Sequence, residues 1–154
     1  MATSHDLVLE KIINAPRENL YRCWTEPELM VKWFTPRPWT TVKVERELRA
    51  GGATVVVMRS PEGQEFPNPG VYLEVVPNRK IVFTDAFTSA WVPKDGAPFF
   101  VGEITFEDAG DGKTRYRAVA RHWTAEARDQ HEKMGFHQDW GKAAEQLEEV
   151  AQTL

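Results

Sequence analysis

The C-terminal segment is the feature that most restricts how this 154-residue chain can fold. From Phe136 to Leu154, apolar side chains recur at helical spacing on one face, and Gln, Lys and Glu residues occupy the other. This pattern is typical of an amphipathic helix with one buried side. We expect the helix to begin near Thr124, which is a suitable N-cap residue, and to contain Gly135 and Gly141. Each glycine should cost about 1 kcal/mol relative to alanine, unless tight packing compensates or the helix bends there.

Most of the preceding chain has the period of β-strands. Alternating or continuous β-branched runs recur from Leu7 to His122, and short turn sequences separate them at 61–63, 77–78 and 108–112. Short turns join antiparallel neighbours, so about seven strands should form one curved antiparallel sheet. Two longer interruptions are predicted to be a loop or irregular edge at Pro67–Gly70 and a loop at 88–98.

Two short helices should lie between the first strand and the rest of the sheet. Pro16 is well placed to open the first, and Thr25 is expected to cap the second. That second helix cannot pass the prolines at Pro36 and Pro38. We therefore predict an α+β fold in a single domain, residues 1–154. Its sheet closes over the long C-terminal helix and leaves an apolar cavity between them.

Alternation along the last strand assigns its two faces. One face carries arginines and should meet solvent, and the other should face the helix. The outer set is Arg115, Arg117 and Arg121, and the inner set is Tyr116, Ala118, Ala120 and His122. The two inward alanines leave volume that the strand does not fill, which is the main indication of a cavity.

Composition excludes several classes of function. The net charge is −4 with both signs spread along the chain, so there is no basic patch for nucleic acid. No apolar stretch is long enough for membrane insertion, and the chain does not open with a signal-peptide pattern. Cys23 is the only cysteine, so it forms no internal disulfide and is expected to be buried and unreactive. These features together predict a cytoplasmic protein.

No motif supports a catalytic constellation, a metal site or a cofactor. Gly112-Lys113-Thr114 resembles the end of a phosphate-binding loop but lacks its earlier glycine and its helix. His131-Glu132 lacks the second histidine of a zinc protease helix. The three histidines of the last third, His122, His131 and His137, lie near Glu132 and Asp139. We expect them to be hydrogen-bonded or exposed rather than metal ligands.

Aromatic residues provide the best candidates for a binding site. Each alone is explained by core packing, but together at the mouth of a sheet–helix cavity they fit a small-molecule pocket. The predicted ligand-binding residues are Trp33, Phe83, Phe100, Tyr116, His122, Phe136 and Trp140. Phe and Trp side chains would supply apolar contact, while Tyr116 and His122 would orient a polar end. An alternative is a cyclase or aldolase-type enzyme with His122 or Asp85 as general base.

Several motifs together resemble one known family. They are Ala15-Pro16, Trp24-Thr25-Glu26-Pro27-Glu28, Trp33-Phe34-Thr35-Pro36, LRAGGATVVVMRSPEG, GVYLEVVPNRKIVFTDA and HEKMGFHQDWGKAAEQL. In this order they resemble the START-like, SRPBCC superfamily and its branch named activator of heat-shock protein 90 ATPase homologue-like. The departures are small: Phe34 replaces the second aromatic of a Trp-Trp pair, and Asp139 replaces a glycine.

The resemblance implies a helix-grip fold, in which a seven-stranded sheet surrounds the C-terminal helix and two short helices close one end. It also implies binding of an apolar or aromatic small molecule, since family members typically bind such ligands; some relatives are cyclases, hydroxylase subunits or lipid carriers. A third hypothesis is a co-chaperone-like protein-binding module. We do not expect that role, because the chaperone activator has additional domains. The oligomeric state is open between a monomer and a homodimer.

Overall fold

The computed structural model describes residues 5–88, 91–96 and 98–154. Seven strands form one antiparallel sheet in the order β1-β7-β6-β5-β4-β3-β2. The strands are β1 (Asp6–Ile13), β2 (Thr40–Arg46), β3 (Ala53–Arg59), β4 (Glu65–Val76), β5 (Lys80–Thr84), β6 (Val101–Gly110) and β7 (Lys113–Arg121). The helices are α1 (Arg17–Thr25), α2 (Pro27–Met30), α3 (Ala125–Lys133) and α4 (Phe136–Ala151). The predicted α+β helix-grip fold is confirmed.

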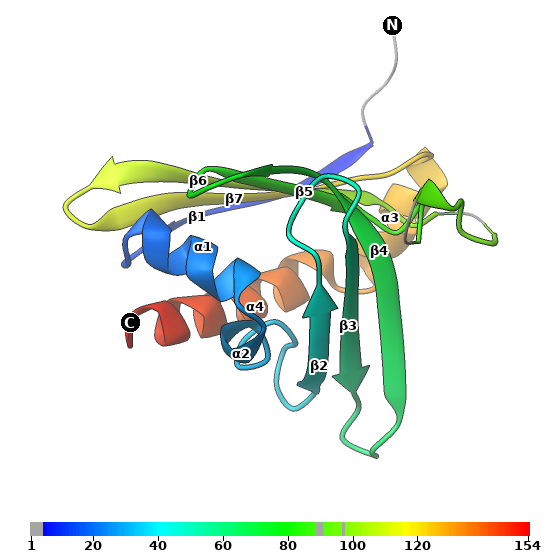
Figure 1. Ribbon diagram of the computed structural model, residues 1–154, viewed down its shortest axis with the longest axis horizontal. Helices are drawn as coiled ribbons and strands as arrows, with labels where there is room; N and C mark the ends of the chain where they lie inside the picture. Colours follow the sequence, from blue (N-terminus) through cyan, green and yellow to red (C-terminus); the bar gives the residue numbers. More distant parts are fainter. Residues whose placement is uncertain (1–4, 89–90, 97) are drawn as a thin grey trace, which may run out of the picture.

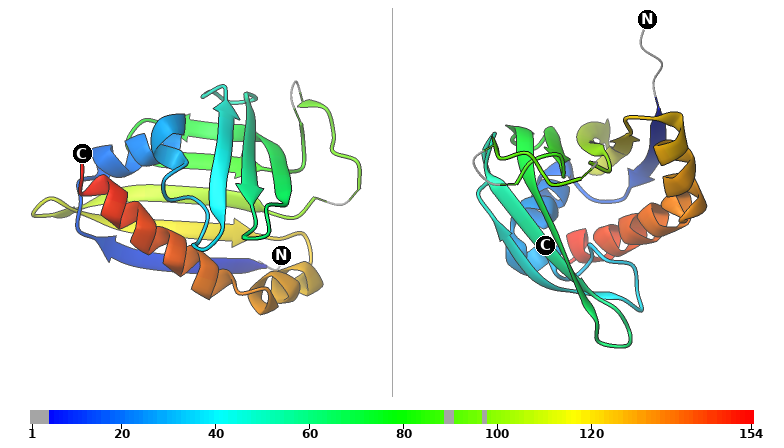
Figure 2. Two further views of the ribbon diagram at one scale, coloured as in Figure 1. Left: turned by 90° about the horizontal axis from the view of Figure 1, so that it is seen from below. Right: turned by 90° about the vertical axis from the view of Figure 1, so that its right-hand side faces the viewer.

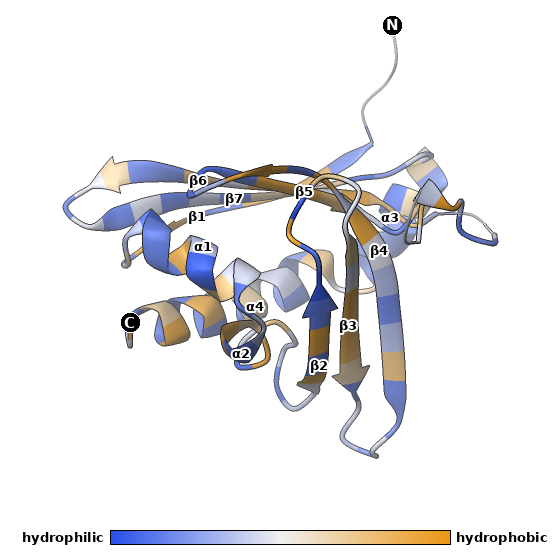
Figure 3. Cartoon of the chain, viewed as in Figure 1, coloured by the Kyte–Doolittle hydropathy of each residue, from blue (hydrophilic) through white to orange (hydrophobic). Residues whose placement is uncertain are grey.

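The sheet is strongly curved, and α4 lies within the curve (Figure 1). Strands β1, β7, β6 and β5 run together, while β2, β3 and most of β4 turn away from them. Seen from below, α4 crosses the strands, and α1 and α2 lie at one end (Figure 2). Apolar colour concentrates on β3, β5 and the middle of β6, whereas α3 is mainly hydrophilic (Figure 3).

The face assignment of β7 is confirmed. Its three arginines are exposed, and Tyr116, Ala118, Ala120 and the following His122 are buried. The outer arginines face acidic residues of the neighbouring strands, as in the 2.8 Å ion pair between Arg121 and Glu103. The volume beside Ala120 is occupied by Leu7 and Phe136, with which it forms a buried cluster. Large side chains from β1 and α4 therefore fill the space that this alanine leaves.

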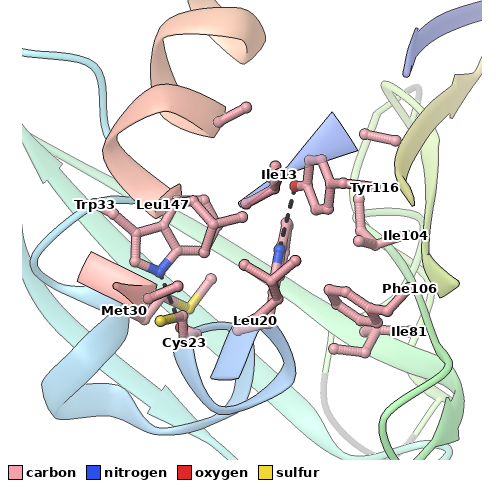
Figure 4. Packing of buried hydrophobic residues seen from close by; sticks show 14 of the residues in the cluster. Ile13, Leu20, Cys23, Met30, Trp33, Ile81, Ile104, Phe106, Tyr116 and Leu147 are labelled. Atoms are coloured by element: carbon pink, nitrogen blue, oxygen red, sulfur yellow. Dashed lines mark hydrogen bonds between the residues drawn. The ribbon is translucent and has the colours of Figure 1, made fainter. Parts of the chain in front are cut away.

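Hydrogen bonds of buried polar atoms join the helices to the core (Figure 4). The indole Nε1 of Trp33 donates to the carbonyl of Cys23 at 3.0 Å, and that of Trp24 donates to the hydroxyl of Tyr116 at 3.2 Å. Gln146 of α4 is 2% exposed, and its amide nitrogen donates to the carbonyl of Trp33 at 2.8 Å. Cys23 is buried as expected, and burial raises the pKa of its thiol to about 11. This end of the molecule is a packed structural core.

The prediction of one continuous C-terminal helix from Thr124 is wrong. Thr124 does cap a helix, since its side chain accepts a hydrogen bond from the amide of Ala127 at 3.0 Å. That helix, α3, ends at Lys133, and α4 begins at Phe136. Between them Gly135 has a φ of +101°, a left-handed conformation that ends helices and favours glycine. The chain therefore turns at this glycine.

One smaller prediction is also wrong, and for another the structure selects between its two alternatives. Thr25 does not cap the second helix: it is the last residue of α1, and its hydroxyl donates to the carbonyl of Tyr21. Pro67–Gly70 is not a loop but part of β4, paired with β3. β5 pairs with β4 only from Val71 onward, so the proline-containing part is an edge on that side. Proline is tolerated at a sheet edge because no partner needs its missing N–H.

The predicted loop at 88–98 includes residues 89, 90 and 97, which lie outside the described residues. Its described part holds one isolated bridge, between Phe87 and Pro93, and no named strand. Among the residues that the structure describes, none of the helices combines the length and apolarity required to cross a membrane.

Candidate functional site

Five of the seven predicted binding residues lie near one another at one end of the sheet. Phe100 precedes β6, His122 follows β7, and Phe136 and Trp140 begin α4. Together with Phe99 and His131, these residues form what we term the aromatic–histidine cluster: Phe99, Phe100, His122, His131, Phe136 and Trp140. Phe83 of β5 packs against its edge, with 6.1 Å between the ring centroids of Phe83 and Phe100. The other two predicted residues, Trp33 and Tyr116, lie in the structural core described above.

A histidine pair stands at the centre of the cluster. Nε2 of His122 and Nδ1 of His131 are 2.8 Å apart, and the two residues are each 7% exposed. The second ring nitrogen of His122, Nδ1, lies 2.8 Å from the carbonyl oxygen of His5. The pair thus joins the end of β7 to α3 and to the segment that precedes β1.

The carbonyl of His5 fixes where the protons of a neutral pair lie. A carbonyl oxygen only accepts, so Nδ1 of His122 must donate to it. Nε2 of a neutral His122 is then an acceptor, and Nδ1 of His131 donates to it. Nε2 of His131 is left with a lone pair. No hydrogen bond to it is found among the described residues, but it is not a buried unpaired atom: among those residues the only one is Nε of Arg46.

The environment keeps His131 uncharged at neutral pH. Burial, and second to it the charge that His122 would carry, lower the pKa of His131 to about 4. A protonated imidazole would lose hydration here, and no carboxylate is among the groups that shift its pKa. The acceptor nitrogen of His131 is therefore unprotonated under ordinary conditions.

Aromatic rings surround the histidine pair. Ring centroids lie 4.5 Å from His131 for Phe99, 5.2 Å for Phe136 and 5.3 Å for Phe100. Trp140 lies 6.0 Å away and packs on Phe136, one helical turn earlier, at 4.6 Å. Phe99, Phe100 and Trp140 are only half-buried. The cluster therefore combines a polar atom with apolar surface that is not fully covered.

Asp85 holds the two phenylalanines in position. Its carboxylate accepts from the backbone amides of Phe99 at 2.9 Å and Phe100 at 3.2 Å, and it forms a 2.9 Å ion pair with Lys94. Glu103, another carboxylate of the sheet, forms ion pairs with Arg121 and Lys80. Asp85 thus acts as an anchor of the segment before β6.

Phe83 is directed by a glycine on the neighbouring strand. It pairs across the sheet with Gly102, and a Cβ at that position would lie 2.5 Å from the Phe83 ring. The outer end of the ring therefore lies against Gly102. From there it contacts Trp24 of the core, at 5.9 Å between centroids, as well as Phe100. Phe83 connects the core and the aromatic–histidine cluster.

α3 covers the cluster through a single side chain. His131 is the only buried residue of this helix. Glu126, Asp129, Gln130 and Lys133 are exposed and, with Met134, line an open hollow of about 430 Å³ on the outer surface. A second hollow lies at the opposite end, near Pro16 and Gln152. α3 is thus a polar cover held inward by one histidine.

The cluster has too few ligands for a metal ion. Within residues 5–88, 91–96 and 98–154, no three His, Cys, Asp or Glu side chains come together in a suitable arrangement. The two histidine nitrogens that face each other are joined by a hydrogen bond. His137 is exposed and lies 3.7 Å from Glu132, so it belongs to the outer surface.

Phe99 was a candidate cavity-lining aromatic but was not among the predicted ligand-binding residues, and sequence reasoning missed the position of His131. Alternation placed His122 on the inner face, but α3 has no apolar stripe from which an inward face could be identified. One available signal was that His131 is the only aromatic residue in a run of charged and small side chains from Ala125 to Lys133. Phe99 adjoins a segment with several prolines and glycines, where no periodicity applies.

Comparison with protein families agrees with this architecture. Residues 14–152 match the family described as Activator of Hsp90 ATPase homolog 1-like protein. The chain belongs to this family. The branch indicated by the sequence motifs is thereby confirmed, within the START-like, SRPBCC superfamily. No curated protein matches the chain significantly.

Solved structures of similar proteins come from several bacteria. A protein from Nitrosomonas europaea is 38% identical, with 96% of this chain and 94% of that chain covered and a TM-score of 0.91. A protein from Mycobacterium smegmatis is 23% identical, with 94% and 89% covered and a TM-score of 0.78. One from Rhodobacter sphaeroides is 20% identical, with 100% and 97% covered and a TM-score of 0.83. The last two similarities concern the fold alone.

Proposed function

We propose that this member of the Activator of Hsp90 ATPase homolog 1-like family binds a small apolar or aromatic molecule at the aromatic–histidine cluster. One observation carries the proposal: the rings of Phe99, Phe100 and Trp140 around His131 are only half-buried, so apolar surface beside a polar side chain is left uncovered. Binding sites commonly combine apolar walls with a few polar atoms.

A ligand would reach the aromatic–histidine cluster by displacing α3. This helix buries only His131, and it is flanked by the turn at Gly135. Moving it outward breaks one hydrogen bond between side chains and exposes the half-buried faces of Phe99, Phe100 and Trp140. Segments with few buried apolar contacts open at low free-energy cost. A ligand would replace contacts that α3 provides in the closed form.

The enzyme alternative has weaker support. A general base needs a lone pair that is not already used. Both ring nitrogens of His122 have protein partners, and the Asp85 carboxylate is engaged by two amides and Lys94. Neither residue named for that role is available to take a proton. That the chain has no co-chaperone role stays a prediction.

Binding can be measured by titrating the protein with indole, 1-octanol and 2-naphthol and following heat release by calorimetry. We expect saturable 1:1 binding of at least one probe. Trp140→Ala should weaken that binding about tenfold, because the indole forms one wall of the cluster. Trp123→Ala is the matched control: Trp123 is 52% exposed and outside the cluster, so its loss should leave affinity unchanged. No saturable binding, or equal losses in both variants, would contradict the proposal.

A further inference from the structure

We infer that Arg46, the last residue of β2, binds the carboxylate of a small organic acid through the end of its guanidinium group. Nε of Arg46 is buried and has no hydrogen-bond partner, and among the described residues it is the only side-chain nitrogen or oxygen in that state. Buried polar groups are nearly always paired, so an unpaired one needs an explanation. The site lies beyond the proposed function, because the aromatic–histidine cluster includes no residue of β2.

The side chain of Arg46 lies on the inner face of the sheet. Arg46 and Val44 are two positions apart on β2, so their side chains share one face, and Val44 packs against the buried core. Arg46 pairs across the sheet with Thr54 of β3 and is half-buried. A positive charge is therefore placed partly out of water, on the face that carries the apolar core.

No carboxylate balances the charge of Arg46 within the described part of the chain. Arginines elsewhere pair with Asp or Glu, as Arg121 does with Glu103, but no such ion pair of Arg46 is found among the described residues. The charge of Arg46 does reach Glu26, yet the pKa of this carboxyl is lowered mainly by its hydrogen bond to Arg22, at 2.7 Å. Glu26 is therefore already engaged. An unbalanced cation that is partly out of water costs free energy, and an anion from outside would recover part of it.

Donor groups at and beside this cation face solvent. The terminal nitrogens of Arg46, Nη1 and Nη2, have no hydrogen-bond partner among the described residues and are not buried unpaired atoms, so they reach water. The hydroxyl of Tyr21, on α1, is in the same situation. Burial raises the pKa of Tyr21, and the positive charge of Arg46 opposes that rise, which places the two groups near each other. An anion bound at Nη1 and Nη2 would therefore lie close to a further donor.

A carboxylate suits this position better than a phosphate. Nη1 and Nη2 of a guanidinium group match the two oxygens of a carboxylate. Arg46 provides one positive charge, and no second cation is among the groups that shift the pKa of Tyr21 or of Tyr72 on β4. One charge neutralises a carboxylate. A phosphate carries more than one negative charge at neutral pH and would keep an excess beside buried groups.

Benzoate, benzamide and inorganic phosphate test the inference at pH 7.5, by nitrogen-15 NMR titration of the wild-type protein followed at the Nε–H of Arg46. We expect saturable binding of benzoate that shifts this resonance. Benzamide has the same shape without the charge and should bind about tenfold more weakly. Phosphate should also bind more weakly than benzoate. No saturation by benzoate, equal affinity for benzamide, or tighter binding of phosphate would overturn the inference.

Variants identify the residue that binds the anion. Arg46→Met keeps an unbranched side chain without the charge and should weaken benzoate binding about tenfold in calorimetry. Arg79→Met is the matched control, because Arg79 is exposed and no ion pair of it is found among the described residues, so affinity should not change. Trp140→Ala should also keep benzoate binding, since its ring belongs to the aromatic–histidine cluster. Undiminished binding by Arg46→Met, or an equal loss in either control, would contradict the inference.

Stability distinguishes a binding role of Arg46 from a structural one. Without benzoate, Arg46→Met should unfold at the same or a higher urea concentration than the wild type, because it removes an unbalanced charge from the inner face. Benzoate should then stabilise the wild type but not Arg46→Met. An Arg46→Met protein that unfolds at lower urea concentration would show that Arg46 supports the fold, and would overturn the inference.

Discussion

Single side chains determine which surface of this protein faces a ligand, and most of them have no periodic signal in the sequence. Strand alternation places His122 on the inner face because side chains of a strand alternate strictly. The same rule cannot say that Trp33 lies in the core through its bond to Cys23, or that Asp85 anchors Phe99. Those contacts join residues from different elements. Their side chains could be identified as apolar or acidic, but their partners could not.

Gly102 leaves room for the Phe83 ring because it has no Cβ atom. We expect Gly102→Ala to lower the free energy of unfolding by about 1–3 kcal/mol, because the new Cβ would overlap the Phe83 ring and force it to move. Urea denaturation measures this change. In a Phe83→Ala background most of the penalty should disappear, since the clashing ring is gone. Strictly additive effects of the two substitutions would show that the ring is not the cause.

Among the elements, the two C-terminal helices show what a hydrophobic pattern can and cannot predict. The apolar face of α4 is strong enough to be identified from sequence, and the structure buries Ala144, Leu147 and Ala151 on it. At Gly135 the sequence left two alternatives open, tight packing within one helix or a bend, since glycine is tolerated within helices as well as at their ends. At Pro67–Gly70 the alternatives of a loop and an irregular edge stayed open for a similar reason: whether a proline interrupts a strand depends on which neighbour lies beside it.

Replacing the two glycines of this region by alanine should change the free energy of unfolding in opposite directions. Gly141 lies inside α4, and a Cβ there would meet nothing within 4 Å outside the helix itself. Gly141→Ala should therefore raise the free energy of unfolding by about 0.8–1 kcal/mol through helix propensity. Gly135→Ala should lower it by about 1 kcal/mol or more, because alanine is strained at a φ of +101°. Urea unfolding of both variants decides this; a destabilised Gly141→Ala protein would contradict the prediction.

At the scale of the whole molecule, the fold could be predicted because many weak signals agree. Short turns indicate antiparallel pairing, alternation gives the faces, and one helix with an apolar stripe must cover the sheet. The family motifs add the order of the elements. The binding site is less predictable, because it is assembled where a segment rich in turns, the end of β7 and the start of α4 meet.

The free energy of unfolding should depend on pH because His131 is buried. The pKa of His131 is 6.5 in the unfolded chain and about 4 in the folded protein. Between these values the unfolded chain binds the proton and the folded protein does not. The contribution of His131 is therefore fully present above pH 6.5 and decreases as the pH falls toward 4. We expect a loss of about 2 kcal/mol between pH 7 and pH 5.

Urea denaturation at both pH values measures this loss. His131→Phe cannot take up a proton at this position, so its stability should depend less on pH by about the same 2 kcal/mol. His137→Phe serves as control, since His137 is exposed and its replacement should leave the pH dependence as in the wild type. Identical pH dependence in wild type and His131→Phe would rule out His131 as the source.

The pairing of β1 with β7 also sets the timing of folding during synthesis. Asp6 pairs with Arg121, so the first strand emerges from the ribosome long before its only neighbour in the sheet. α4, which fills the inside of the curve, emerges later still. Until β7 and α4 are made, the growing chain thus lacks both the strand that pairs with β1 and the helix that shields the apolar face of the sheet. Products that terminate before α4 would expose an uncovered sheet.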